Sequence, residues 1–157
     1  MEPSQAILYY LQHLSVLTHR QSDQVLQEQL GIGTSQYRIL QVLQSNPAVQ
    51  QKQIASLLGQ TEASISRQVK LMQDRGLIVA QVNPENKREH LTQLLPKGER
   101  LLDVGTQVLL QYHRPSFESL SHKDQATLIK LLAQVHNSIC TVDGIEGLLH
   151  VGAPTAE

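Results

Sequence analysis

Residues 51–79 have the sequence QKQIASLLGQTEASISRQVKLMQDRGLIV, and this stretch decides the fold. Its apolar residues recur at helical spacing in two short segments, which are separated by Gly59 and a turn. After Gly76 the period changes and β-branched residues begin. The stretch therefore predicts a short helix, a tight turn, a second helix and then a strand.

The first of these helices is expected over residues 50–58, with Gly59 at its end. Thr61 can cap the second helix, and Glu62 favours the positive end of its dipole. The second helix turns a small, basic face outward, while its inward face holds the apolar residues Ile65, Val69 and Met72. Such a pair is a helix-turn-helix, whose second member can lie in the major groove of DNA.

A β-hairpin is predicted directly after the second helix. Residues 77–82 and 89–94 suit its two strands, and residues 83–86 form a turn cluster with Asn, Pro and Glu. Lys87 and Arg88 are expected at the tip of this hairpin. A charged hairpin that follows a helix-turn-helix indicates a winged helix.

On the N-terminal side, residues 5–30 predict one long amphipathic helix that ends at Gly31 and Gly33. Thr34 or Ser35 can then cap a further helix, which the Ser-Asn-Pro at residues 45–47 ends.

On the C-terminal side, Pro96 can begin another long helix, which Pro115 should kink or end. Ser121 and Asp124 resemble a capping box that opens a last helix. The fold class is therefore expected to be mainly α with a small β-hairpin wing.

Composition limits the class of protein. The chain has 157 residues, a mass of 17.5 kDa and a single cysteine, Cys140, so an internal disulfide framework is ruled out. The sequence contains neither an apolar run of roughly 18 residues nor a signal peptide, and a cytoplasmic protein with no membrane partner is expected. Eight basic and five acidic residues give residues 52–100 a charge of +3, which is compatible with nucleic-acid binding.

The sequence resembles the MarR (multiple antibiotic resistance regulator) family of transcriptional regulators. Three segments support the resemblance, in order and at family spacing: residues 53–59 (QIASLLG), residues 63–78 (ASISRQVKLMQDRGLI) and residues 86–98 (NKREHLTQLLPKG). With the flanking helices, the similarity covers about residues 5–140. The sequence departs from the family pattern at Asn86, where an Asp is usual, and at Leu95, where a Thr is common.

The resemblance implies a homodimer in which the first and last helices of two chains intertwine. It divides the chain into a helical dimerisation region at residues 1–32 and 97–142, a winged helix-turn-helix at residues 33–96 and a C-terminal tail at residues 143–157. Such a dimer would repress transcription from a palindromic operator on double-stranded DNA. An alternative is a helical dimer that uses its winged helix for protein contact, as an adaptor or anti-regulator.

DNA contacts are expected from the outward face of the second helix of the motif and from the wing. Arg67 and Lys70 can reach base edges or phosphates, and the wing can enter the minor groove. The remaining candidates are polar residues at helix starts. The full set is Thr61, Ser64, Ser66, Arg67, Lys70, Lys87, Arg88, Gln36, Lys52 and Gln60.

The resemblance also implies a small phenolic or other lipophilic effector that is held between the dimerisation helices and the winged helix. Tyr9, His13, Tyr37 and Arg38 are candidates to line that site, although Tyr and Arg there are as well suited to helix packing or phosphate contact.

No metal, cofactor or catalytic site is expected. His113, His122 and His136 lie in the last two predicted helices, but no two of them have the i, i+4 spacing of a chelating pair. A Gly-rich phosphate loop and a Gly-x-Ser-x-Gly elbow are both missing from the sequence, so an enzyme is not expected.

Overall fold

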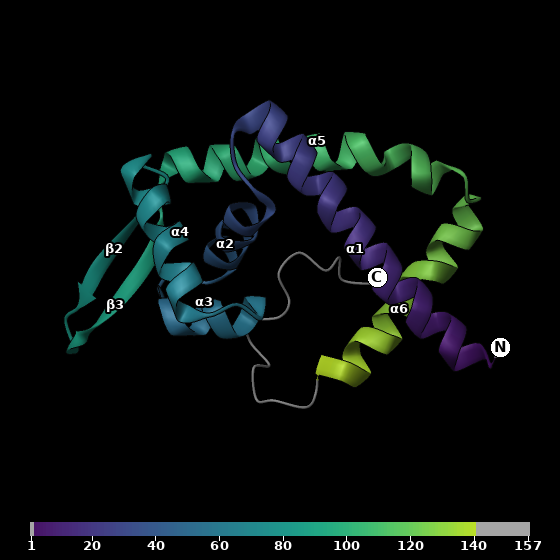
Figure 1. Ribbon diagram of the computed structural model, residues 1–157, viewed down its shortest axis with the longest axis horizontal. Helices are drawn as coiled ribbons and strands as arrows, with labels where there is room; N and C mark the ends of the chain where they lie inside the picture. Colours follow the sequence, from purple (N-terminus) through teal and green to yellow (C-terminus); the bar gives the residue numbers. More distant parts are fainter. Residues whose placement is uncertain (1, 141–157) are drawn as a thin grey trace.

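A computed structural model describes residues 2–140, and Figure 1 shows its arrangement. The long helices α1 and α5 cross each other, the winged helix hangs from one end of α5, and α6 turns back from the other end. The elements, in order, are α1 (Pro3–Leu30), α2 (Thr34–Ser45), β1 (Val49–Gln50), α3 (Gln51–Leu58), α4 (Glu62–Asp74), β2 (Ile78–Asn83), β3 (Asn86–Leu94), α5 (Pro96–Glu118) and α6 (His122–Cys140). The predicted tail at residues 143–157 lies outside the described residues, so the structure does not test it.

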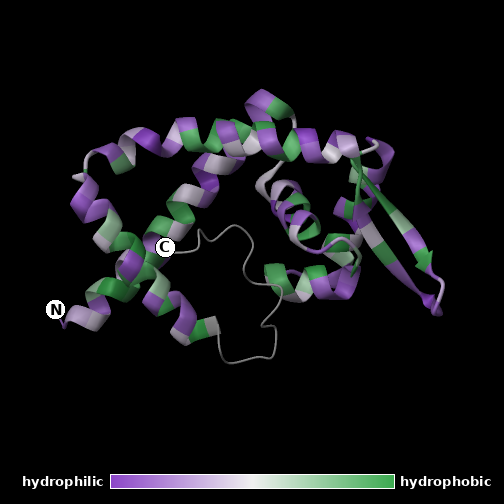
Figure 2. Ribbon diagram, turned by 180° about the vertical axis from the view of Figure 1, so that it is seen from behind, coloured by the Kyte–Doolittle hydropathy of each residue, from purple (hydrophilic) through white to green (hydrophobic). Residues whose placement is uncertain are grey.

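The hydrophobic core lies inside the winged helix and beneath the ends of α1 and α5 that meet it. Leu26 of α1 and Leu102 of α5 belong to the same buried cluster as Ile54 of α3 and Ile65 of α4. Figure 2 shows that apolar residues recur along these helices between polar ones. The core therefore fixes the long helices to the winged helix.

The wing sheet has three antiparallel strands in the order β1-β3-β2, one more than the predicted hairpin. The additional strand, β1, pairs Val49 with Thr92 and Gln50 with Leu91. Two residues cannot show a strand period, and their partners are far away in sequence, so the pattern gave no signal for β1. The turn is shorter than expected, because Asn83 pairs with Asn86 and β3 already includes Lys87 and Arg88.

The junction between α1 and α2 corrects one prediction. Gly31 ends α1 in the left-handed region, at φ 63°, as its sequence indicated. Neither Thr34 nor Ser35 caps α2, however, because the N-cap is Gly33, which has no side chain. The Oδ1 of Asp23, on α1, accepts the Thr34 N–H at 2.8 Å instead. The cap of α2 is thus a tertiary contact.

Helix α5 begins at Pro96 as predicted but continues through Pro115 to Glu118. Pro115 lacks the N–H that would bond the carbonyl of Gln111, and a single further turn follows it. At the start of α6, the Ser121 Oγ accepts the Asp124 N–H at 3.2 Å and donates to its carboxylate at 2.6 Å. The predicted capping pair is confirmed.

Much of the apolar surface of the long helices is not covered within the chain. Ile7 and Leu14 of α1 are 55% and 54% exposed, and Leu131 and Ile139 of α6 are 53% and 65% exposed. Of the side chains described in α6, none is buried. Within residues 2–140, no helix combines the length and apolar character needed to span a membrane.

Candidate nucleic-acid interface

The buried face of helix α4 fixes which of its residues point to solvent. Its buried stripe, Ile65, Val69 and Met72, packs in the core, which leaves the opposite face in solvent. Ser66, Arg67 and Lys70 are all exposed on that face. The side chain of Thr61 accepts the Ser64 N–H at 3.2 Å, which confirms the predicted N-cap. The result is a rigid helix with an outward face of cations and small polar groups.

Polar contacts at the tip shape the wing. The Oδ1 of Asn83 accepts the Glu85 N–H at 3.0 Å, and its Nδ2 donates to the Glu89 carboxylate at 3.2 Å. The Oδ1 of Asn86 accepts the Arg88 N–H at 3.2 Å. These bonds fix the backbone while the side chains of Lys87 and Arg88 remain exposed. The wing thus presents two cations on an ordered hairpin.

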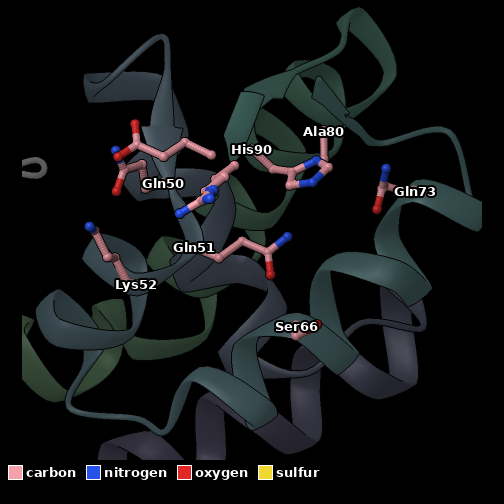
Figure 3. A pocket seen from close by; sticks show the side chains of 9 residues that line it. Gln50, Gln51, Lys52, Ser66, Gln73, Ala80 and His90 are labelled. Carbon is pink, nitrogen blue, oxygen red and sulfur yellow. The ribbon is translucent and has the colours of Figure 1, made fainter. Parts of the chain in front are cut away.

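A groove of about 620 Å³ lies between α4, the start of α3 and the wing, and Figure 3 shows it from close by. Three of the predicted DNA contacts meet there: Ser66 from α4, Lys52 from α3 and Arg88 from β3. Eight of its nine lining residues are polar or charged, and the ninth is Ala80. Small-molecule pockets are mostly apolar, so this groove is better suited to a hydrated, charged polymer.

Other predicted contacts are engaged within the protein. The amide nitrogen of Gln36 donates to the Gln68 side chain at 3.0 Å, which ties α2 to α4. Gln60 links the start of α2 to the start of α4. Its Nε2 donates to the Ser35 Oγ at 3.1 Å, and its Oε1 accepts from the Ser64 Oγ at 3.3 Å. Gln36, Gln60 and Ser64 therefore brace α4, and any contact with DNA would compete with these bonds.

The structure adds groove residues that the sequence did not single out, namely Gln50, Gln51, Gln73 and His90 together with Glu89. Gln73 lies near the end of α4, and His90 lies on β3 opposite Val82. Arg88, Glu89 and His90 are consecutive and all line the groove, and their closeness along the chain was available in the sequence. The approach of α3 to the wing was not evident from the sequence.

The candidate effector residues do not meet in one place. Tyr37 is buried, and its hydroxyl forms a hydrogen bond of 2.9 Å with the hydroxyl of Thr106. Tyr37 also lines a pocket of about 570 Å³ between α1, α2, α5 and α6. Tyr9 and His13 form a tilted ring pair, with centroids 5.5 Å apart, on α1 away from that pocket. Arg38 is exposed and does not line it.

That pocket is lined by apolar residues and by charged and polar residues, including the carboxylate of Glu118. Leu109, Leu110 and Phe117 are among the apolar residues, and His113, Arg114 and His122 supply groups that can bind an anion. Ser22 fixes the ring of His113 through a hydrogen bond of 3.0 Å to its Nε2. Within the described residues, no group of three His, Cys, Asp or Glu side chains could hold a metal ion.

Comparison with known proteins relates this geometry to a family. The MarR family model matches residues 30–89. A protein named as a transcriptional regulatory protein for the hcr operon of Thauera aromatica is 25% identical over 128 residues, which are 82% of this chain and 77% of that protein.

Two solved structures share the fold. MarR of E. coli, in its apo form, is 22% identical with a TM-score of 0.68, over 80% of this chain and 96% of that chain. The transcriptional repressor CouR, bound to a 23-mer DNA duplex, is 23% identical with a TM-score of 0.71, over 86% of this chain and 95% of that chain.

The order and arrangement of the winged helix and the flanking long helices agree with those of the solved MarR structure. The winged helix-turn-helix of this chain thus matches the MarR family of DNA-binding transcriptional regulators over residues 30–89.

Proposed function

We propose that the protein is a homodimeric repressor that binds a palindromic operator and is released by a small-molecule effector. The observation that supports this most directly is the groove between α4 and the wing, where Lys52, Ser66 and Arg88 meet beside the exposed Arg67 and Lys70. In this proposal, Arg67 and Lys70 contact the major groove, and Lys87 and Arg88 grip the minor groove or its phosphates.

The dimer rests on the apolar surface that one chain leaves uncovered. The first half of α1 and the whole of α6 expose large hydrophobic side chains, although the end of α1 and the start of α5 are buried in the core. A contiguous surface of this kind is rare in a monomer and marks an interface. We therefore place the dimer contact on α6 and the N-terminal half of α1. Two-fold symmetry would then present two α4 helices to successive major grooves.

The effector site is proposed in the pocket that Tyr37 lines. Its apolar residues suit an aromatic or aliphatic body, and Arg114 and His113 suit a carboxylate. Tyr37 connects this pocket to α2, and Gln36 of α2 is bonded to Gln68 of α4. A ligand that prefers one position of α2 would thus change the affinity of α4 for DNA by the ratio of its two affinities.

The test is a fluorescence-anisotropy titration with duplex DNA from upstream of the protein's own gene, against random duplex as competitor. We expect tight binding that resists competitor and falls steeply with salt, because phosphate contacts release counterions. Arg67→Ala should remove most of the binding, with a loss of about 1–3 kcal/mol per base contact. Arg20→Ala is the matched control, because Arg20 is exposed on α1.

A shallow salt dependence together with an unaffected Arg67→Ala variant would contradict the DNA-contact assignment. That result would favour the alternative in which the winged helix binds a protein partner. The effector is tested in the same assay with a panel of small phenolic and lipophilic carboxylates. Release of DNA by a member of the panel should be lost in Arg114→Ala, whereas DNA binding without the ligand should not change.

A further inference from the structure

His90 occupies a position in the groove that the proposed contacts above do not use. Its side chain is exposed on β3 and lines the groove together with Lys52 and Arg88. Figure 3 shows the His90 ring beside Ala80, between the wing and the helix that bears Ser66. Within residues 2–140, the ring makes no hydrogen bond to another group. Both of its nitrogens are therefore available to a molecule that enters the groove.

The charges around His90 favour an anion. Lys52 of α3 and Arg88 of β3 are cationic, and the groove-lining residues of α4 and β2, Ser66, Gln73 and Ala80, are neutral. The one carboxylate that lines the groove, Glu89, accepts the Asn83 Nδ2–H at 3.2 Å. An anion beside His90 would thus meet cations and neutral donors.

We infer that His90 contacts a DNA phosphate in this groove and makes the affinity for DNA depend on pH. This inference rests on the DNA-binding function proposed above and adds a contact residue and a regulatory variable to it. Histidine is the side chain that ordinarily changes charge between about pH 5 and 8. A phosphate stabilises the protonated imidazole, so protonation and DNA binding favour each other.

The sign follows from this linkage. A protonated imidazole has a positive charge and a second N–H donor, so a phosphate contact at His90 should make the affinity for DNA higher at the lower pH. As pH rises, the contact reduces to one neutral hydrogen bond. Because His90 would contact a phosphate of the DNA backbone and no base, the pH effect on affinity should be similar for operator and for random duplex.

The experiment measures anisotropy with a random-sequence duplex of about 30 base pairs, at fixed low ionic strength, at about pH 6 and about pH 8. We expect the wild-type protein to bind roughly three to ten times more tightly at the lower pH, the contribution of one phosphate contact. His90→Gln should bind like wild type at the higher pH and should change by less than about twofold between the two. Its salt slope at the lower pH should be shallower by about 1.

Two further variants sharpen the result. His90→Arg has a permanent charge and should bind at the higher pH about as tightly as wild type does at the lower pH. His19→Gln removes an exposed histidine of α1, away from the groove, and should keep the full pH effect of the wild type. The gain expected from His90→Arg cannot arise from misfolding.

A wild-type protein that binds DNA equally at both pH values would overturn the inference, as would a His90→Gln variant that retains the pH effect. Either result would leave the DNA-binding function intact. Failure of the wild-type protein to bind any duplex at either pH would instead contradict the proposed function itself. The two failures are thus distinct.

Discussion

Gly98 lies where the start of α5 meets the end of α4 and the wing. It is buried, and a Cβ at this position would collide with the carbonyl oxygen of Leu77 and approach the Leu94 Cδ1 to 2.8 Å. The Leu77 oxygen already accepts the Leu95 N–H at 3.0 Å, so it is fixed by the backbone and cannot move aside easily. Close packing at a single residue thus determines how α5 attaches to the winged helix.

Gly98→Ala should lower the free energy of unfolding by about 1–3 kcal/mol, the usual cost of overpacking. Helix propensity alone predicts the opposite sign, a gain of about 1 kcal/mol. Urea denaturation at fixed protein concentration measures the difference. Gln107→Ala, at an exposed position of α5, is the control and should change stability by less than about 0.5 kcal/mol. A stabilised Gly98→Ala variant would refute the packing argument.

Asp23 of α1 stabilises the start of a different helix, α2. Asp23→Ala should cost about 1 kcal/mol of stability, because the Thr34 N–H at the start of α2 loses its acceptor. Asp23→Asn keeps an acceptor but loses the charge that favours the helix N-terminus, so its loss should be smaller. Urea unfolding of the two variants gives the order, and equal losses would contradict the capping role.

At the scale of elements, the ends of helices are held by groups from other elements. The guanidinium of Arg75, at the end of α4, donates to the carbonyl oxygen of Gly31 at 2.8 Å, and Lys97 of α5 donates to the carbonyl oxygen of Arg75 at 2.7 Å. Cations are favourable at helix C-termini, where carbonyls lack partners. These two bonds link α1, α4 and α5. Arg75 is one of the eight basic residues counted in residues 52–100, yet its side chain is bonded to a backbone carbonyl of the protein itself.

Arg75→Ala should therefore lower the free energy of unfolding by about 1 kcal/mol, because it removes a hydrogen bond that an exposed charged side chain donates. The salt slope of DNA binding should not change. Arg67→Ala should do the reverse, with weaker binding to operator DNA and unchanged stability. Comparing the two arginines in parallel urea and anisotropy titrations separates a structural cation from a DNA contact. A salt slope that falls in Arg75→Ala would assign this residue to the DNA interface as well.

At the scale of the whole molecule, the uncovered apolar surface of α6 determines the behaviour in solution. Leu128, Leu132, Val135 and Ile139 follow each other at steps of three and four, so they form one stripe on the helix. All four are exposed, and Leu132 near the middle of the stripe is 44% exposed. A helix with such a stripe and no described buried side chain gains its stability from a partner.

Leu132→Glu should shift the protein from dimer to monomer in light scattering coupled to size exclusion, because a carboxylate would be buried in an apolar interface. DNA affinity should fall with it, since two half-sites bound together gain avidity. Gln134→Glu introduces the same charge on the opposite face of α6 and should remain dimeric. A monomeric wild-type protein, or a dimeric Leu132→Glu variant, would contradict the placement of the interface on this stripe.

The sequence by itself determined the order and type of the helices, the winged helix and the outward face of α4. These features depend on local information: apolar residues at helical spacing, Gly59 and Gly76 at element ends, and Thr61 at a cap. Such signals lie within one turn or one strand, so they survive in the sequence. The exposed positions of Arg67 and Lys70 follow from the same periodicity.

Only the tertiary structure decided the contacts between distant segments. The strand β1, the Asp23 cap, the Gln36–Gln68 bond and the groove that joins Lys52 to His90 all bring together residues from separate elements. Local periodicity states which face of an element is apolar, but it does not state which other element that face meets. That choice depends on how the whole core packs, and the packing places a histidine of the wing within the proposed DNA groove.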